Sequence, residues 1–199
     1  MSHYFINNPN LNKDLSNYKV NLRGSDFIFY TQAGVFSKNN LDYGSKLLIE
    51  NIKITSDTKT IIDIGCGYGP IGLSLAKNNR VKSYMYDINE RAVELAKLNA
   101  KSNDISNVEI YTNNLLDGIN VKADLIVSNP PIRAGKQTVF KLYEQAYNNL
   151  NSNGAFYCVI QKKQGAPSSF EKIKELFENV EIITKSRGYW IIYAKKLWY

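Results

Sequence analysis

A single run of glycines constrains the fold of this chain more than any other segment: Asp63-Ile-Gly-Cys-Gly-Tyr-Gly-Pro-Ile-Gly72. Its first three glycines, Gly65, Gly67 and Gly69, lie between residues 60–64, which are expected to form a buried strand, and residues 71–77, which are expected to form a helix. Glycine permits backbone conformations and close approaches that other residues do not. The run therefore predicts a strand-to-helix turn whose backbone lies against a ligand, as in a Rossmann-like sheet.

The rest of the chain alternates short apolar runs with helical segments. This alternation predicts an α/β fold with a doubly wound, mostly parallel seven-stranded sheet. A β-hairpin is expected before it, and the last two strands are expected to form an antiparallel hairpin. The expected hairpin strands are 18–22 and 27–30, the expected sheet strands are 60–64, 83–86, 108–111, 123–128, 155–160, 180–184 and 189–194, and the expected helices are 41–52, 71–77, 90–100, 139–150 and 170–177.

Length and composition limit the organisation of the chain. Its 199 residues, 44% of them hydrophobic, can bury one sizeable core, so one domain is expected over 18–199 after a polar arm, 1–17. The two cysteines support neither a disulfide framework nor a zinc site, and a reducing cytoplasm fits them best. No segment is apolar enough to span a membrane. His3 is the only histidine, so the chemistry must proceed without imidazole and no metal is expected.

Two kinds of cofactor fit the glycine run, and its acidic residue separates them. Gly67, Gly69 and Gly72 also satisfy the dinucleotide pattern G-x-G-x-x-G, and Asp87 follows about twenty residues later. Asp63 would repel a pyrophosphate, whereas its carboxylate can form charge-assisted hydrogen bonds with an ammonium group. The acid thus favours an amino-acid-bearing sulfonium cofactor. Glycines that only permit tight packing are the alternative.

A second informative segment, Asn129-Pro-Pro-Ile132, follows the expected strand 123–128. Two consecutive prolines remove two amide donors, which leaves carbonyl groups that can accept hydrogen bonds. The side chain of Asn129 adds another carbonyl. An exocyclic amine such as guanine N2 needs two acceptors, because its lone pair becomes nucleophilic only as the nitrogen rehybridises. The segment therefore indicates methyl transfer to nitrogen by Asn129 and the Pro130 carbonyl, with a plain loop as the alternative.

Both segments resemble motifs of the class I S-adenosylmethionine-dependent methyltransferases. The glycine run resembles motif I, an acid followed by Gly-x-Gly-x-Gly. The resemblance implies that Asp87 holds the ribose hydroxyls and that Asn114 contacts the adenine; a helix N-cap and a turn residue are the respective alternatives. The implied cofactor is S-adenosyl-L-methionine. The implied cofactor-binding residues are Asp63, Gly65, Cys66, Gly67, Tyr68, Gly69, Asp87, Ile88, Asn114 and Asn129.

Asn129-Pro-Pro-Ile132 resembles motif IV of the amino-methylating branch, which acts on adenine N6, guanine N2 or glutamine N5. Most members have Tyr or Phe where this chain has Ile132, so the ring expected to stack on a flipped base is missing there. Phe36, Tyr68 and Tyr189 are the candidates to replace it. The implied catalytic residues are Asn129, Pro130, Pro131 and Ile132.

A longer likeness narrows the family. Gly34-Val-Phe-Ser37 and Leu41-Asp-Tyr-Gly-Ser45 resemble the start of the catalytic half of the bacterial small-subunit (16S) ribosomal RNA guanine-N2 methyltransferases. The likeness implies guanine N2 of 16S ribosomal RNA as the target, RNA or the small subunit as the partner, and Phe36 near the site. A net charge of +7 favours an anionic partner, although a basic solvated surface would give the same charge. Cations that follow the strands are expected to contact phosphates: Arg133, Lys136, Lys162, Lys163 and Arg187.

Three other functions fit parts of this pattern. A protein-glutamine N5 methyltransferase shares the Asn-Pro-Pro segment. A nicotinamide-dependent oxidoreductase fits the G-x-G-x-x-G pattern of Gly67, Gly69 and Gly72. A non-catalytic RNA-binding module would need only the cationic residues that follow the strands. The missing aromatic and the cations count against the glutamine enzyme, and Asp63 and the prolines have no role in the oxidoreductase. The glycine and Asn-Pro-Pro motifs make the non-catalytic module the least economical, so the RNA methyltransferase is the preferred hypothesis. The oligomeric state is left open by the sequence.

Overall fold

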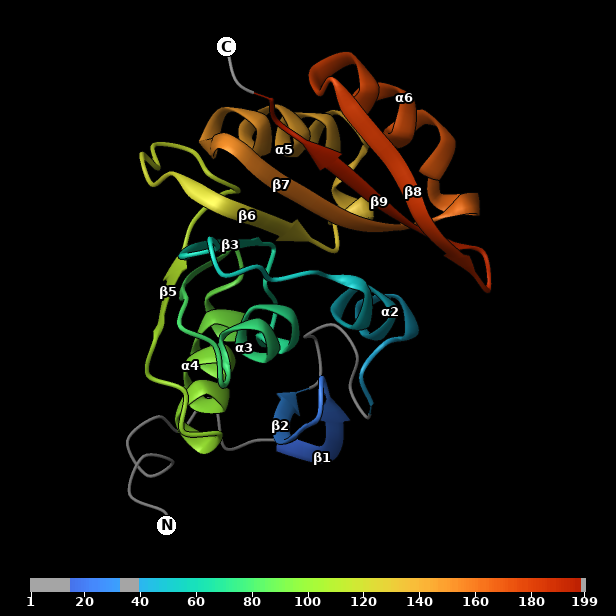
Figure 1. The fold of residues 1–199 in the computed structure, drawn as a ribbon. Coiled ribbons are helices and arrows are strands. Elements are labelled where there is room, and N and C mark those ends of the chain that lie inside the picture. The colour runs from blue at the N-terminus through green and yellow to red at the C-terminus, as the bar shows by residue number, and fades with distance from the viewer. Residues whose placement is uncertain (1–14, 33–39, 198–199) are drawn as a thin grey trace.

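A computed structural model describes residues 15–32 and 40–197 and arranges them around a seven-stranded sheet (Figure 1). The strand order is β5-β4-β3-β6-β7-β9-β8, in which β9 pairs antiparallel with both β7 and β8 and the other pairs are parallel. The expected fold class is confirmed, including the closing antiparallel hairpin. The strands are β3 (Thr60–Ile64), β4 (Lys82–Asp87), β5 (Val108–Thr112), β6 (Ala123–Ser128), β7 (Leu150–Gln161), β8 (Asn179–Ser186) and β9 (Tyr189–Lys195).

Helices cover both faces of the sheet because its central strands are apolar on both sides. In β3, Ile61 belongs to the core on one face, and Ile62 and Ile64 belong to the core on the other. Such strands must be covered twice to exclude water. One layer contains α2 (Tyr43–Asn51), α3 (Pro70–Ala76) and α4 (Glu90–Ser102), and the opposite layer contains α5 (Lys136–Asn149) and α6 (Ala166–Leu176).

The expected N-terminal hairpin is present and is longer than predicted. Strands β1 (Leu15–Leu22) and β2 (Ser25–Gln32) pair along their whole length around Arg23-Gly24, both at positive φ. Such a two-residue turn matches the twist of the strands it joins. Residues 15–17 of the expected polar arm therefore belong to β1, because Leu15 packs on the core and Ser16 hydrogen-bonds across to Thr31.

Two asparagines of α4 dock this hairpin onto the domain. Asn103 accepts a hydrogen bond from the Ile28 amide and donates to the Ile28 carbonyl. Asn99, one helical turn earlier, does the same with the amide and carbonyl of Tyr30 and also donates to the Tyr68 carbonyl, at 2.8 Å. The two side chains thus satisfy backbone groups of β2 as a neighbouring strand would. Through Tyr68, Asn99 also connects the hairpin to the glycine run.

We expect Asn99→Ala to destabilise the protein by about 2–3 kcal/mol, because buried backbone groups of Tyr30 and Tyr68 would lose their partners. For a chain of this size, such a loss lowers the melting temperature by about 5 °C or more. Thermal unfolding followed by circular dichroism measures it. Asn120→Ala, at an exposed loop position, is the matched control. Equal melting temperatures for the two variants would contradict the docking role.

Candidate functional site

The carboxyl ends of β3, β4 and β6 bring both sequence motifs to one edge of the sheet. The amides of Gly65 and Cys66 donate to the Tyr86 carbonyl at 2.8 and 3.0 Å, which attaches the glycine run to the end of β4. From the other side, the Pro131 ring lies 4.0 Å from where a Cβ on Gly65 would be. The two motifs are therefore adjacent across the end of β3, as a doubly wound sheet requires of its ligand site.

The glycine run forms an open backbone cradle. Gly65, Gly67 and Gly69 have φ values of 73°, 57° and 98°, which other residues rarely adopt. A Cβ built on Gly67 would meet no atom within 4 Å, so space is open in front of this residue. The loop thus offers room for a ligand against its backbone. This openness is the feature expected of a cofactor site, and tight packing does not explain Gly67.

Asp63 lies at the base of the cradle and is fully buried. Its Oδ2 accepts a hydrogen bond from the Gly72 amide at 2.8 Å, while its Oδ1 has no hydrogen-bond partner within residues 15–32 and 40–197. Burial raises its pKa to about 7, and the nearby charge of Asp87 acts in the same direction. A buried, unpaired carboxylate oxygen is costly unless a cation or donor approaches it. The unpaired carboxylate oxygen of Asp63 therefore fits a cofactor with a positive group, which is the kind of cofactor that the sequence predicted.

Asp87 and Ile88 flank the open side of the cradle. One oxygen of Asp87 accepts from the Gly67 amide at 2.8 Å, and the other accepts from the Asn89 amide. The N-cap of α4 is Asn89, so capping that helix does not account for Asp87. Ile88 is 69% exposed, which is unusual for a large apolar side chain and suits a flat ring such as adenine.

The remaining predicted cofactor residues contribute in different ways. Asn114 is exposed and donates to Asp117 in the loop after β5, which is also consistent with a turn role. Tyr68 and Cys66 are buried and face the protein interior. The Tyr68 hydroxyl bonds that of Tyr18 at 2.7 Å, and burial raises the pKa of the Cys66 thiol. These two residues offer a ligand their backbone only, so Tyr68 cannot replace the missing motif IV ring.

Asn129 is anchored by a residue that the sequence did not single out. Its side-chain Nδ2 donates to the Ser45 Oγ of α2 at 3.0 Å. Ser45 is held in turn by the helix cap, since its amide donates to Asp42. Because the NH₂ group of Asn129 is used in this way, its Oδ1 points elsewhere and has no hydrogen-bond partner among the described residues. Asn129 thus keeps one side-chain acceptor that no described protein group uses.

The two prolines form a tight turn that differs from expectation. The Pro130 carbonyl accepts from the Ile132 amide at 2.9 Å, and Pro131 has φ −75° and ψ 77°, the values of an inverse γ-turn. The Pro130 carbonyl was expected to be unpaired and instead makes one local hydrogen bond. A carbonyl oxygen has two lone pairs, so one remains for a substrate. The turn holds this carbonyl rigidly beside Asn129.

The side chain of Ile132 packs on a different face of the sheet from the Asn129 side chain. It packs against the core cluster shared by α5 and α6, whereas Asn129 reaches α2 on the other face. On that same α2 face, Tyr189 at the start of β9 packs on Gly44, where an added Cβ would lie 2.8 Å from its Cε1. Of the three aromatic candidates, Tyr189 therefore packs on the α2 residue next to Ser45, the hydrogen-bond partner of Asn129. Phe36 lies outside the described residues.

The predicted cationic residues lie in segments that follow the strand ends. Lys162 and Lys163 lie in η2 (Lys162–Gln164), and the Lys162 amide donates to Gly188 at 2.6 Å, next to Arg187 in the β8–β9 turn. Arg133 lies in η1 (Ile132–Ala134), and Lys136 begins α5. All five are exposed. They border the edge at which the cradle and Asn129 lie.

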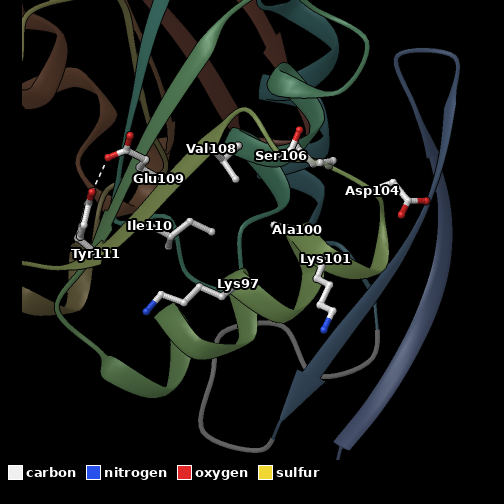
Figure 2. Close-up of a pocket in the computed structure, with 10 residues that line it drawn as sticks. Lys97, Ala100, Lys101, Asp104, Ser106, Val108, Glu109, Ile110 and Tyr111 are labelled. Carbon is white, nitrogen blue, oxygen red and sulfur yellow. Dashed lines mark hydrogen bonds between the residues drawn. The ribbon is translucent and has the colours of Figure 1, made fainter. Parts of the chain in front are cut away.

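One hollow on the surface is separate from this edge. It lies between α4 and the edge strand β5 and is lined by side chains that include Lys97, Lys101, Ile110 and Tyr111 (Figure 2). The Tyr111 hydroxyl donates a hydrogen bond to Glu109 at its rim (Figure 2). Neither Asp63 nor Asn129 lines it, so it is not part of the candidate site.

A seven-stranded sheet in this order, with a glycine cradle and an Asn-Pro-Pro turn at one edge, defines a class I methyltransferase. The methyltransferase small domain family matches residues 26–193, and the chain belongs to that family. The cofactor predicted from the sequence, S-adenosyl-L-methionine, is confirmed. The family assignment therefore favours a methyltransferase over the dinucleotide-binding enzyme that Gly67, Gly69 and Gly72 would also fit.

Comparison with individual proteins extends this assignment. An uncharacterized protein of Bacillus subtilis, YbxB, is 44% identical over 198 residues, which is 98% of each chain. The ribosomal RNA large subunit methyltransferase G of Aeromonas hydrophila is 30% identical over 88% of this chain and 47% of the relative. A solved structure of the T. thermophilus 16S rRNA N2 G1207 methyltransferase shares the fold, with a TM-score of 0.82 and 20% identity over 92% of this chain and 51% of that one. The chain spans about half the length of the last two proteins.

No helix in the described part of the chain is both long and apolar enough to cross a membrane. Residues 15–32 and 40–197 contain no group of three or more His, Cys, Asp or Glu side chains placed to hold a metal ion. The site's polar groups are instead one buried carboxylate, one partly exposed carboxylate and amide or backbone groups.

We expect cofactor affinity to rise with pH, with a midpoint near the pKa of about 7 of Asp63. Below it, the buried carboxyl is protonated and neutral; above it, the carboxylate attracts the cationic cofactor. Isothermal titration calorimetry between about pH 6 and about pH 8 measures this change, and binding near neutrality should release a proton. An affinity that is flat over this range would contradict the assignment.

The free energy of unfolding of the cofactor-free protein should instead fall with pH, because a raised native pKa means that stability is lost as pH rises through about 7.

Proposed function

We propose that this protein transfers a methyl group from S-adenosylmethionine to an exocyclic amine of ribosomal RNA, most specifically guanine N2 of 16S ribosomal RNA. The observation that carries the proposal is the hydrogen bond from Asn129 to Ser45, which uses the NH₂ group of Asn129 and leaves its Oδ1 as an acceptor on the residue next to Pro130. Two acceptors at fixed positions suit an amine with two N–H donors. A hydroxyl or thiol substrate would leave one of them unused.

The chain's own groups can perform the transfer without a strong base. When bound, S-adenosylmethionine supplies an electrophilic methyl group on a sulfonium. Asn129 Oδ1 and the Pro130 carbonyl accept the two amine hydrogens, which favours the pyramidal nitrogen of the transition state and directs its lone pair at the methyl carbon. The methylated nitrogen is acidic and can release its proton to water afterward. This sequence of events agrees with a chain whose only histidine is His3.

Three observations support RNA as the substrate. Exposed cations border the site, including Lys162 and Arg187, and the chain carries a net charge of +7. A relative that is 30% identical is a large-subunit ribosomal RNA methyltransferase. The protein with the same fold and a TM-score of 0.82 is a 16S rRNA N2 G1207 methyltransferase, solved with AdoMet and guanosine. A cytoplasmic location follows from this substrate.

A labelling experiment tests the proposal. Purified protein is incubated with methyl-labelled S-adenosylmethionine and with unmodified ribosomal RNA of either subunit, free or assembled, and labelled nucleosides are identified by mass spectrometry. We expect labelled N2-methylguanosine in small-subunit RNA. Label in large-subunit RNA would keep the chemistry and change the target, and labelled N6-methyladenosine would change the base. Label on a protein glutamine, with none in RNA, would overturn the proposal.

A further inference from the structure

The aromatic ring missing from motif IV has a structural replacement on the other side of Asn129. Ile132 packs into the α5 and α6 core, so it offers no ring to a substrate at the acceptor side. The first turn of α2 approaches Asn129 there, through the Ser45 hydrogen bond of 3.0 Å. A ring packed on this turn would lie on the face of the sheet toward which the Asn129 side chain reaches.

Tyr189 has this position. It begins β9 opposite Gln161, the last residue of β7, and so lies at the carboxyl edge of the sheet. Its ring packs directly on Gly44, the neighbour of Ser45; a Cβ at Gly44 would lie 2.8 Å from Cε1 and 3.0 Å from Cδ1. Gly44 thus admits the ring where any larger residue would displace it. Tyr189 is only partly buried, so part of its surface remains available.

Tyr43 packs against Tyr189, and Arg187 packs against Tyr43. The Tyr43 ring lies 5.8 Å from the Tyr189 ring at 51°, and the Tyr43 hydroxyl bonds Ser186 at 2.7 Å. The Arg187 guanidinium lies 4.6 Å from the centre of the Tyr43 ring. A ring so supported loses little freedom on stacking, and an adjacent guanidinium suits a nucleotide phosphate.

We propose that Tyr189, supported by Tyr43, is the surface on which the nucleobase stacks while its amine is held by Asn129. This rests on the proposed RNA substrate and names the residue that recognises it. A flat heteroaromatic ring is favoured over a glutamine side chain, because an aliphatic amide gains little from stacking. Tyr189 is a substrate-binding residue and takes no part in moving the methyl group or a proton.

The test uses fluorescence of a short single-stranded RNA that contains one 2-aminopurine, a base with the C2 amine of guanine whose emission falls when it stacks. Wild-type protein with S-adenosylhomocysteine should quench it. Tyr189→Ile should weaken RNA binding about tenfold or more, and Tyr189→Phe should keep it, because stacking needs the ring and not the hydroxyl. In methyl transfer, Tyr189→Ile should raise KM for RNA far more than it lowers kcat.

Tyr193→Ile is the matched control, since Tyr193 lies on the same face of the same strand and packs on Tyr157 away from the edge. Each variant is scored only if it binds S-adenosylhomocysteine as wild type does; if Tyr189→Ile does not, Tyr189→Thr replaces it. Wild-type quenching that Tyr189→Ile retains would overturn this inference and leave the proposed function standing. No quenching by wild type that binds cofactor would also overturn this inference, and the labelling experiment then decides the proposed function separately.

Discussion

Replacing Asn129 by alanine is expected to lower turnover about 100-fold to 1,000-fold, because one of two fixed acceptors for the amine is removed. Cofactor affinity should change little, since the Asn129 side chain bonds Ser45 and not the glycine run. Steady-state methyl transfer with ribosomal RNA, together with calorimetry of S-adenosylmethionine, measures the two effects.

Ser45→Ala sharpens this experiment. It keeps Asn129 and removes only the group that orients it, so a smaller loss of about tenfold in kcat is expected. Asn151→Ala, which removes an amide that bonds Asp124 far from the cradle, should leave turnover unchanged. Turnover near wild type in Asn129→Ala would remove the acceptor mechanism.

Replacing Asp63 by asparagine is the second large effect, and it separates charge from structure. The amide can still accept the Gly72 hydrogen bond through its oxygen, so the cradle should keep its shape. It carries no charge, so at about pH 8 S-adenosylmethionine should bind about 10-fold to 100-fold more weakly, the size of a lost charge-assisted hydrogen bond. The rise of affinity with pH should vanish as well.

Asp124→Asn provides the control for Asp63→Asn. Asp124 accepts hydrogen bonds from the amides of Lys59 and Thr60 near the amino end of the sheet. The change should lower stability and leave cofactor affinity as it is. If Asp63→Asn binds the cofactor as tightly as wild type at both ends of the pH range, Asp63 supports the loop only and does not meet the cation.

Most of the fold follows from local patterns in the sequence. Strands β3 and β6 begin and end at the predicted residues, because apolar runs bounded by turn residues have few alternatives. The length of strand β1 was underestimated because Ser16 and Asn17 are polar, and its pairing with β2 and the contact of Leu15 with the core decide its length. The α4 asparagines that dock the hairpin were also missed, since their partners lie 69 and 75 residues away in the chain.

The sequence by itself determined the class of site: Gly65 to Gly69 follow one parallel strand and Asn129 follows another, and carboxyl ends of neighbouring parallel strands share an edge. Only the tertiary structure decided which side chains complete it. Ile132 is only three residues after Asn129, but its side chain packs on the α5 and α6 face. Tyr189, 60 residues after Asn129, packs on Gly44 of α2, the helix to which Asn129 bonds. The physical reason is that order along the chain sets a strand's position, while the direction of each side chain depends on the helices packed against both faces.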